Sequence, residues 1–247
     1  MIQVKDLRKA FGPIVAVDGV TFSVNRGDVL GFLGPNGAGK TTTMRMLCGF
    51  LLPDGGSATV AGHDVVTGSI AVRRSVGYLA ENVPAYDEMT PASFLRFVGQ
   101  ARGMAAGARR EAIEKVTDSC ALGDVMHQPI GTLSKGYRRR VGLAQSLLHA
   151  PPVLILDEPT DGLDPNQKHD IRQLIKRLAK EKCIVVSTHI LEEVDAICSR
   201  IILIDRGRIR VDSAPDALRR EMGGSLEKIF RRLTTKGGPV PVAGGVE

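Results

Sequence analysis

Short segments rich in apolar and β-branched residues recur along the chain and are separated by longer amphipathic stretches. Those that we interpret as strands are Met1–Lys5, Thr21–Val24, Val29–Leu33, Val76–Leu79, Val153–Leu156, Cys183–Val186 and Ile201–Ile204. Val153–Leu156 is apolar at every position, which is typical of a central parallel strand covered on both faces. The alternation of strands and helices predicts an α/β domain with a mostly parallel central sheet.

Amphipathic stretches between these segments predict helices. One helix is expected over Thr42–Leu52, directly after the third strand, and another begins at Asp164-Pro165. A short helix near the end is indicated by the apolar positions Leu226, Ile229, Phe230 and Leu233. The last residues, 234–247, include many Gly, Pro and Val, and we expect them to form a flexible tail.

Residues from about 84 to 148 interrupt the alternation with helices alone. Thr90 precedes Pro91, which combines a capping side chain with a proline in the first helical turn. Ala108–Leu122 is also helical by composition. We therefore predict a single domain over residues 1–233, in which a helical subdomain at about 84–148 is inserted into an α/β core.

The composition is that of an ordinary globular protein, with 43% apolar and 24% charged residues. No apolar stretch reaches the ~18–20 residues of a membrane helix, so we do not expect the chain to cross a membrane. Its charged N-terminus does not resemble an export signal. The four cysteines are widely spaced, without a pattern typical of metal ligands, and are expected to be buried or half-buried free thiols.

The net charge of +6 is mild. It favours an anionic ligand or an acidic lipid surface, and no nucleic-acid partner is expected. The one dense basic run, Arg138-Arg139-Arg140, is interpreted as a solvated helix face.

The segment from Gly34 to Thr41 carries the clearest chemical signal. It reads GPNGAGKT and fits the phosphate-binding pattern G-x-x-x-x-G-K-[ST] between a strand and a helix. The glycines let backbone N–H groups turn toward phosphate oxygens, and the helix N-terminus adds a partial positive charge. Lys40 is expected to reach the β- and γ-phosphates of a nucleotide, and Thr41 to bind Mg²⁺. The residues expected to surround the phosphates are Gly34, Pro35, Asn36, Gly37, Ala38, Gly39, Lys40, Thr41 and Thr42.

Two acids follow the apolar strand Val153–Leu156. Burying unpaired carboxylates is costly, so Asp157 and Glu158 indicate a ligand at this strand end. We expect Asp157 to hold Mg²⁺ opposite Thr41, and Glu158 to orient and polarise the attacking water. A solvated acidic turn is the alternative, which the phosphate loop upstream disfavours.

Two further segments are placed where the same ligand could reach them. Ser187-Thr188-His189 follows the strand Cys183–Val186, at the carboxyl edge where open α/β sheets bind ligands. Leu133-Ser134-Lys135-Gly136-Tyr137 precedes a helix for which Ser134 is a good N-cap. It presents N–H groups and a hydroxyl suited to a phosphate.

Taken in order, these motifs resemble the nucleotide-binding subunit of ATP-binding cassette (ABC) transporters. The resemblance covers roughly residues 2–233 and rests on GPNGAGKT (34–41), GYLAEN (77–82), LSKGYRRR (133–140), LILDEPTDGLD (154–164) and STH (187–189). It implies a P-loop NTPase fold with an N-terminal antiparallel β part, and ATP and Mg²⁺ as ligands. The variants GYL-x-E and LSKGY look similar to those of bacterial cassettes that serve drug, lipid or polysaccharide exporters.

The resemblance also implies an arrangement of subunits. Two cassettes would form a head-to-tail dimer with two ATP molecules between them. Ser134 and Gly136 of one chain would contact the γ-phosphate held by the other, and Asp164 would cross the interface. His189 would bridge the γ-phosphate and Glu158, giving the family an ATP-hydrolysing site.

At the N-terminal end, Phe11 is located where the family keeps an aromatic residue that stacks on adenine. The alternative is a phenylalanine of the core.

The family further implies an integral membrane permease subunit as partner and a location on the cytoplasmic face of the membrane. The helical subdomain would receive a helix of the permease, and Tyr86, Asp87, Met89 and Phe94 are candidates for that contact. The second cassette would be another copy of this chain or a paralogous one.

Two positions depart from the usual pattern of the family. Glu81 stands where a Gln usually touches Mg²⁺ and the attacking water, and Asn82 could supply an amide one residue later. We expect Glu81 to act through Mg²⁺, since its charge opposes the γ-phosphate unless a metal screens it. Lys135 replaces a Gly, and either adds a positive charge near the partner's ATP or faces solvent.

Two other functions are considered beside a transporter ATPase. One is a soluble cassette ATPase that serves no transporter. The other is a regulatory module that binds ATP without hydrolysing it, against which Glu158 argues.

Overall fold

In the computed structural model, residues 1–234 are described, and the predicted tail from residue 235 onward lies outside the described residues. The central sheet has the strand order β10-β9-β3-β8-β7-β6. Five of its strands are parallel: β3 (Val29–Leu33), β6 (Val76–Leu79), β7 (Val153–Asp157), β8 (Cys183–Ser187) and β9 (Arg200–Asp205). The edge strand β10 (Arg208–Ser213) runs antiparallel to β9. The predicted mostly parallel sheet is therefore confirmed.

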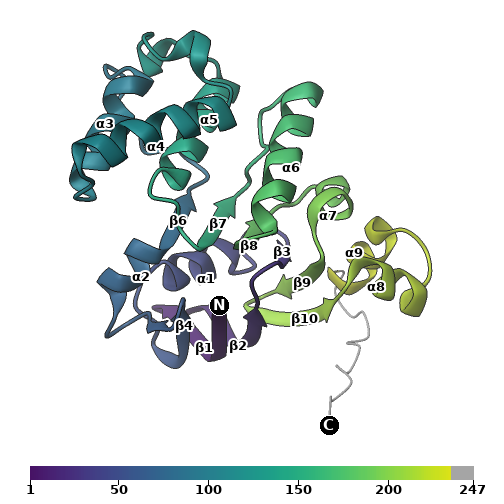
Figure 1. Cartoon of the computed structure of the whole chain (residues 1–247). Helices are drawn as coiled ribbons and strands as arrows, with labels where there is room; N and C mark the ends of the chain where they lie inside the picture. The colour runs from purple at the N-terminus through teal and green to yellow at the C-terminus, as the bar shows by residue number, and fades with distance from the viewer. Residues whose placement is uncertain (235–247) are drawn as a thin grey trace.

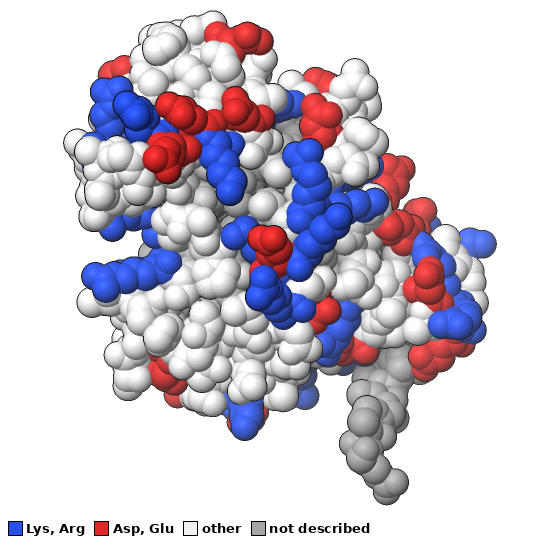
Figure 2. Space-filling view, viewed as in Figure 1, with Lys and Arg blue, Asp and Glu red and all other residues white. Residues whose placement is uncertain are grey.

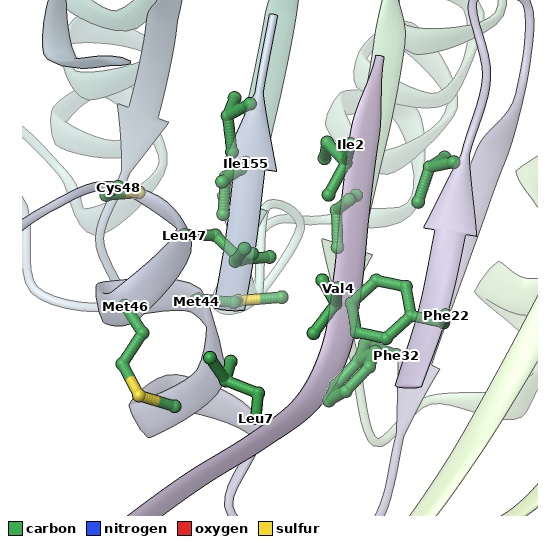
Figure 3. Packing of buried hydrophobic residues seen from close by; sticks show 14 of the residues in the cluster. Ile2, Val4, Leu7, Phe22, Phe32, Met44, Met46, Leu47, Cys48 and Ile155 are labelled. Atoms are coloured by element: carbon green, nitrogen blue, oxygen red, sulfur yellow. The ribbon is translucent and has the colours of Figure 1, made fainter. Parts of the chain in front are cut away.

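A second sheet is antiparallel throughout, with the order β2-β1-β4-β5. It consists of β1 (Ile2–Phe11), β2 (Ile14–Val24), β4 (Gly55–Val60) and β5 (His63–Asp64). The N-terminal antiparallel part is confirmed, although β1 and β2 are each longer than the predicted segments. Between the two sheets, the rings of Phe22 and Phe32 lie 5.7 Å apart between centroids, and Figure 3 shows Met44 and Leu47 reaching the same apolar layer from α1.

Helix α1 (Lys40–Leu47) follows β3 directly, so the phosphate-binding pattern ends inside the first helical turn. The predicted helix Thr42–Leu52 was wrong at both ends. Gly49, with φ of +66°, takes the left-handed conformation that commonly ends helices, and this stops α1. Phe50 and Leu52 lie beyond it, exposed.

Helices α3 (Pro91–Ala101), α4 (Ala106–Ser119) and α5 (Lys135–Leu147) form a lobe of their own, reached through the ends of β6 and β7 (Figure 1). Thr90 caps α3 reciprocally with Ser93, which accounts for the sharp start of that helix. A core of buried aliphatic residues joins this lobe to the central sheet and to α6 (Pro165–Ala179). The lobe is therefore packed against the strands whose ends carry Asp157 and Glu158.

The remaining helices are short. Helix α2 (Ser69–Ser75) leads into β6, α7 (Leu191–Ile197) leads into β9, and α8 (Pro215–Met222) and α9 (Leu226–Thr234) cover the β9–β10 side. Within residues 1–234 no helix has both the length and the apolar character needed to span a membrane. Cys48, Cys120 and Cys183 are buried and Cys198 is half-buried, as predicted.

Candidate functional site

The loop between β3 and α1 bends at two glycines. Gly37 and Gly39 have φ of +79° and +104°, values that residues with a side chain rarely adopt. A Cβ on Gly39 would also collide with the carbonyl oxygen of Ala16. The loop can therefore close over the first turn of α1 only because these two residues are glycines.

Lys40, the first residue of α1, is folded back into this loop. Its Nζ donates hydrogen bonds to the carbonyl oxygens of Gly34, at 2.7 Å, and Pro35, at 3.1 Å, and the residue is only 8% exposed. Burial lowers the pKa of Lys40, whereas the carboxylates of Glu158 and Asp157 raise it. The ammonium group thus lies in the field of the two acids at the end of β7.

Thr41 and Asp157 bring two oxygen donors together. The Thr41 hydroxyl donates to Oδ2 of Asp157 at 3.2 Å, across the ends of two segments that are far apart in sequence. Asp157 is 2% exposed, and its Oδ1 accepts a short hydrogen bond from the Ser187 hydroxyl. A hydroxyl and a carboxylate in contact are ligands that Mg²⁺ prefers, so this pair fits the predicted metal position.

Glu158 faces His189. The Nδ1 atom of His189 lies 2.9 Å from Oε1 of Glu158, whose side chain is 13% exposed. The other carboxylate oxygen, Oε2, is buried and has no hydrogen-bond partner among the described residues. Glu158 also has a φ of +50°, an uncommon conformation for a residue with a side chain, and such conformations are found disproportionately at functional sites. Oε2 is therefore a buried acceptor that no other described residue uses.

A buried carboxylate, which sequence analysis did not identify, contacts the loops that carry Glu158 and His189. Glu193 on α7 is fully buried and accepts hydrogen bonds from the hydroxyls of Thr188, at 2.9 Å, and Thr160. Burial raises the pKa of Glu193, and the Thr188 hydroxyl opposes that shift. Because Thr160 follows Glu158 by two residues and Thr188 precedes His189, Glu193 joins the two loops that carry the acid and the histidine.

The interpretation of Arg138-Arg139-Arg140 as a solvated face was wrong for two of the three residues. Arg139 and Arg140 are 5% and 7% exposed. Arg140 pairs with Asp170 of α6 at 3.3 Å, and Arg139 donates to main-chain carbonyl oxygens at the ends of β6 and β7. For Arg139 the reason is that every residue type carries a main-chain carbonyl oxygen, so the sequence contains no sign of these partners.

The predicted partner-facing residues have contacts within this chain. Ser134 accepts a hydrogen bond from the backbone N–H of Tyr137 and caps α5, while Asp164 accepts one from the N–H of Gln167 and caps α6. Gly136 is buried against the side chain of Gln167. One chain alone therefore positions these three residues at two neighbouring helix starts.

Glu81 and Lys135, the two positions that depart from the usual pattern of the family, differ in their surroundings. Glu81 and Asn82 are both exposed, and the Glu81 carboxylate is among the charges that raise the pKa of Lys40. Lys135 forms an ion pair with Asp161 at 2.8 Å, with both side chains largely open to solvent. Glu81 is thus near the phosphate loop, whereas Lys135 is held by an acid of its own chain.

Phe11 ends β1 with 49% of its surface exposed, so the alternative of a core phenylalanine is wrong. The Lys9 ammonium lies 5.7 Å from the centre of its ring. An exposed aromatic face beside a cation is available for stacking.

A broad hollow of about 820 Å³ lies between one side of the helical lobe and the body of the protein. It is lined by exposed apolar residues, including Phe50, Ile70 and Phe97, and its charged lining residues are all arginines: Arg73, Arg74 and Arg102. Figure 2 shows the molecule hollowed at its left edge, with Lys and Arg atoms on both sides of the hollow. Burial and the nearby Arg102 lower the pKa of His149, another lining residue, to about 4.

Of the four residues considered for a permease contact, Phe94 is not available. It is 3% exposed and belongs to the core of the lobe. Tyr86 is 53% exposed and packs edge-on against Phe97, which does line the hollow. The exposed aromatic residue of α3 is Phe97, one helical turn after Phe94, and the contact with a permease stays a prediction.

Comparisons with known proteins agree with this geometry. The sequence model of a family described as "ABC transporter" matches residues 17–161. The chain is 37% identical to the "Probable multidrug ABC transporter ATP-binding protein YbhF" of Escherichia coli, over 94% of this chain but only 41% of that protein. It is 36% identical to the "Nod factor export ATP-binding protein I" of Ralstonia nicotianae, covering 93% of this chain and 72% of that protein.

Two solved structures show the same fold. One, described as the ATP-binding subunit of an ABC transporter, has a TM-score of 0.86 and 29% identity, over 94% of this chain and 99% of that one. Another, the ATP-binding cassette MJ0796 in a dimeric post-hydrolysis state, has a TM-score of 0.80 and 23% identity, over 87% and 98%. The family match covers more than half of the chain, so this chain belongs to the ABC transporter family, as one of its ATP-binding subunits.

Proposed function

We propose that this chain binds Mg-ATP on its Gly34–Thr41 loop and hydrolyses it with Glu158 and His189, in a head-to-tail dimer that drives a separate membrane-spanning subunit. The observation that carries the proposal is the buried, unpaired Oε2 of Glu158, opposite the phosphate loop and beside His189. The relatives named for multidrug and Nod factor export favour an exporter.

The residues present fit a magnesium–triphosphate ligand. Lys40 can exchange its two carbonyl contacts for phosphate oxygens, since those contacts lie in the loop that surrounds the phosphates. Thr41 and Asp157 would hold Mg²⁺ between them. The metal, when bound, supplies positive charge against the phosphate oxygens. Phe11 would stack on the adenine with its open face.

Hydrolysis needs a water aligned with the terminal phosphate. Glu158 can accept a hydrogen bond from that water through Oε2, while His189 holds Oε1 and keeps the carboxylate in one orientation. The fixed pair would orient the water without having to reorganise during the reaction.

The dimer is supported by the exposed position of Ser134 at the start of α5. Ser134 is exposed at the N-terminus of α5, where a hydroxyl and free N–H groups favour an anion. In a second copy turned head to tail, Ser134 and Gly136 would cover the γ-phosphate, and Asp164 would lie at the interface. A dimeric neighbour of the same fold provides a precedent for the assembly.

The hollow beside α3 suits the membrane partner. Its exposed aromatic and aliphatic lining favours an amphipathic helix, and its arginines favour one with acidic side chains. The chain would then be held on the cytoplasmic face of the membrane by this subunit.

Reversing charge in the hollow is expected to release the chain from its partner. In the double variant Arg73→Glu and Arg102→Glu, recovery of the chain with integral membrane proteins from detergent-solubilised membranes should fall by at least about fivefold, because rim charges guide association. Arg110→Glu, an exposed position on α4 outside the hollow, is the matched control and should leave recovery unchanged. If no membrane protein is captured even by the wild-type chain, a soluble cassette ATPase becomes the better account.

A second test concerns Glu81. Glu81→Gln is expected to raise the Mg²⁺ concentration for half-maximal hydrolysis by about fivefold, since one charge fewer near the ion changes its binding by on the order of 1 kcal/mol. The measurement is phosphate release at fixed ATP over a Mg²⁺ titration. Unchanged Mg²⁺ dependence and turnover would remove Glu81 from the site, and the same shift in Asn82→Ala instead would assign the position to Asn82.

A further inference from the structure

One buried cation connects the helical lobe to the catalytic acid. Arg139 is on the second turn of α5, five residues after Ser134, and is 5% exposed. Its Nη1 donates to the carbonyl oxygens of Ala80, at 2.7 Å, and Glu81, at 2.6 Å. Its Nη2 donates to the carbonyl oxygens of Asp157 and Glu158. A single guanidinium therefore binds four main-chain carbonyl oxygens. Two belong to consecutive residues after β6, and two to consecutive residues at the end of β7.

The sheet explains why one side chain can reach both segments. Strands β6 and β7 are parallel neighbours, with Leu79 opposite Leu156, so both chains leave the sheet at the same edge. The planar guanidinium carries five N–H donors in a fixed fork, which allows it to span the two chains. An ammonium group offers three donors around a single atom and cannot bridge the same set.

The neighbouring residues Arg138 and Arg140 bind other partners. Arg138 donates to the carbonyls of Leu133 and Gly131, within the lobe itself. Arg140 is as buried as Arg139 but pairs with Asp170 on α6 and contacts the Cys120 carbonyl. Of the three, only Arg139 contacts the main chain of the acids at the end of β7.

A contact with the main chain of Glu158 affects the direction of its carboxylate. With φ of +50°, the backbone at Glu158 holds an uncommon conformation, and the direction of its carboxylate depends on that conformation. The same guanidinium holds the carbonyl of Glu81, whose carboxylate lies near Lys40. A shift of α5 would thus be transmitted to both acidic residues at once.

We propose that Arg139 is a positioning residue for ATP hydrolysis, which fixes the main chain of Glu158 and Glu81 relative to α5 and so links the Ser134 end of that helix to the attacking-water site. This rests on the proposed function of Glu158. It goes further by naming the contact through which the helical lobe sets the geometry of the acid. Closing of the lobe over a partner's nucleotide would reach Glu158 through this side chain.

Arg139→Gln and Arg139→Lys are the test variants, with Arg140→Gln as an equally buried control. In both Arg139 variants kcat for ATP should fall by about 10²-fold while KM stays within about threefold, since a misplaced catalytic group costs rate rather than binding. Arg140→Gln should keep kcat within about threefold once all variants are compared below their melting temperatures. A residue that merely supports folding would lower the melting temperature without separating kcat from KM.

A double variant tests the route of the effect. In a Glu158→Gln background, Arg139→Gln should lower the residual rate by less than about threefold, because the two residues act as a unit. A full and independent loss there, or an unchanged kcat in both Arg139 variants of a chain that hydrolyses ATP, overturns the proposal. If Arg139→Gln does not fold, Arg139→Lys decides alone. A wild-type chain without any hydrolysis would overturn the proposed function itself, and is thereby distinguished.

Discussion

Glu158→Gln is expected to lower the rate constant of ATP hydrolysis by about 10³-fold and to leave ATP affinity nearly unchanged. The substitution keeps the size of the side chain and its contact with His189, but removes the charge that polarises the water. The unpaired Oε2 atom is the acceptor that is lost. In the proposed function, ATP binding depends on Lys40 and the glycine loop, which the change does not touch.

The measurement is phosphate release under single-turnover conditions, combined with nucleotide binding at equilibrium. If hydrolysis reopens the dimer as proposed, Glu158→Gln should also remain dimeric with Mg-ATP in gel filtration, where the wild type returns to monomer. A Glu158→Gln chain that turns over at the native rate would exclude Glu158 as the residue that polarises the attacking water.

Lys40→Ala is expected to weaken ATP binding by about 10²-fold and abolish detectable hydrolysis, since hydrogen bonds to a charged group contribute about 1.5–3 kcal/mol each. Lys40 is the one side-chain cation that the structure places inside the phosphate loop among residues 1–234. Removing it leaves the backbone N–H groups but no mobile charge for the terminal phosphate.

Binding of Mg-ATP measured by calorimetry checks this expectation. Lys115→Ala, an exposed lysine on α4, is the control and should bind as the wild type does. Equal affinity in Lys40→Ala and the wild type would mean that the loop is not the triphosphate site.

The central strands were predictable because burial on both faces demands unbroken apolar runs. Val29–Leu33 matches β3 residue for residue, and Val153–Leu156 and Cys183–Val186 each end one residue before β7 and β8 do. Strands β10 and β4 were missed because neither has an unbroken apolar run. Strand β10, at the edge of the central sheet, reads RIRVDS, and β4, between β1 and the two-residue strand β5, reads GGSATV. Helices α2 and α7, of seven residues each, are too short for periodicity to indicate.

The residues of the site likewise divide into those that the sequence could locate and those that it could not. Residues whose chemistry depends on side-chain type, such as Lys40, Asp157 and Glu158, could be located from spacing, and the structure brings them together. Arg139 could not, because its partners are backbone carbonyls. Glu193 could not be located either. Its partners are two threonine hydroxyls, and in the sequence it cannot be distinguished from an exposed acid on a short helix.

The most direct test of the head-to-tail site mixes two inactive chains, Lys40→Ala and Ser134→Arg. In a mixed dimer, one site combines the intact Lys40 of the second chain with the intact Ser134 of the first, and the other site has neither. If chains pair at random, phosphate release should return to about a quarter of the wild-type rate. A mixture that is no faster than either variant alone, while the wild type hydrolyses ATP, would contradict a site shared between two chains.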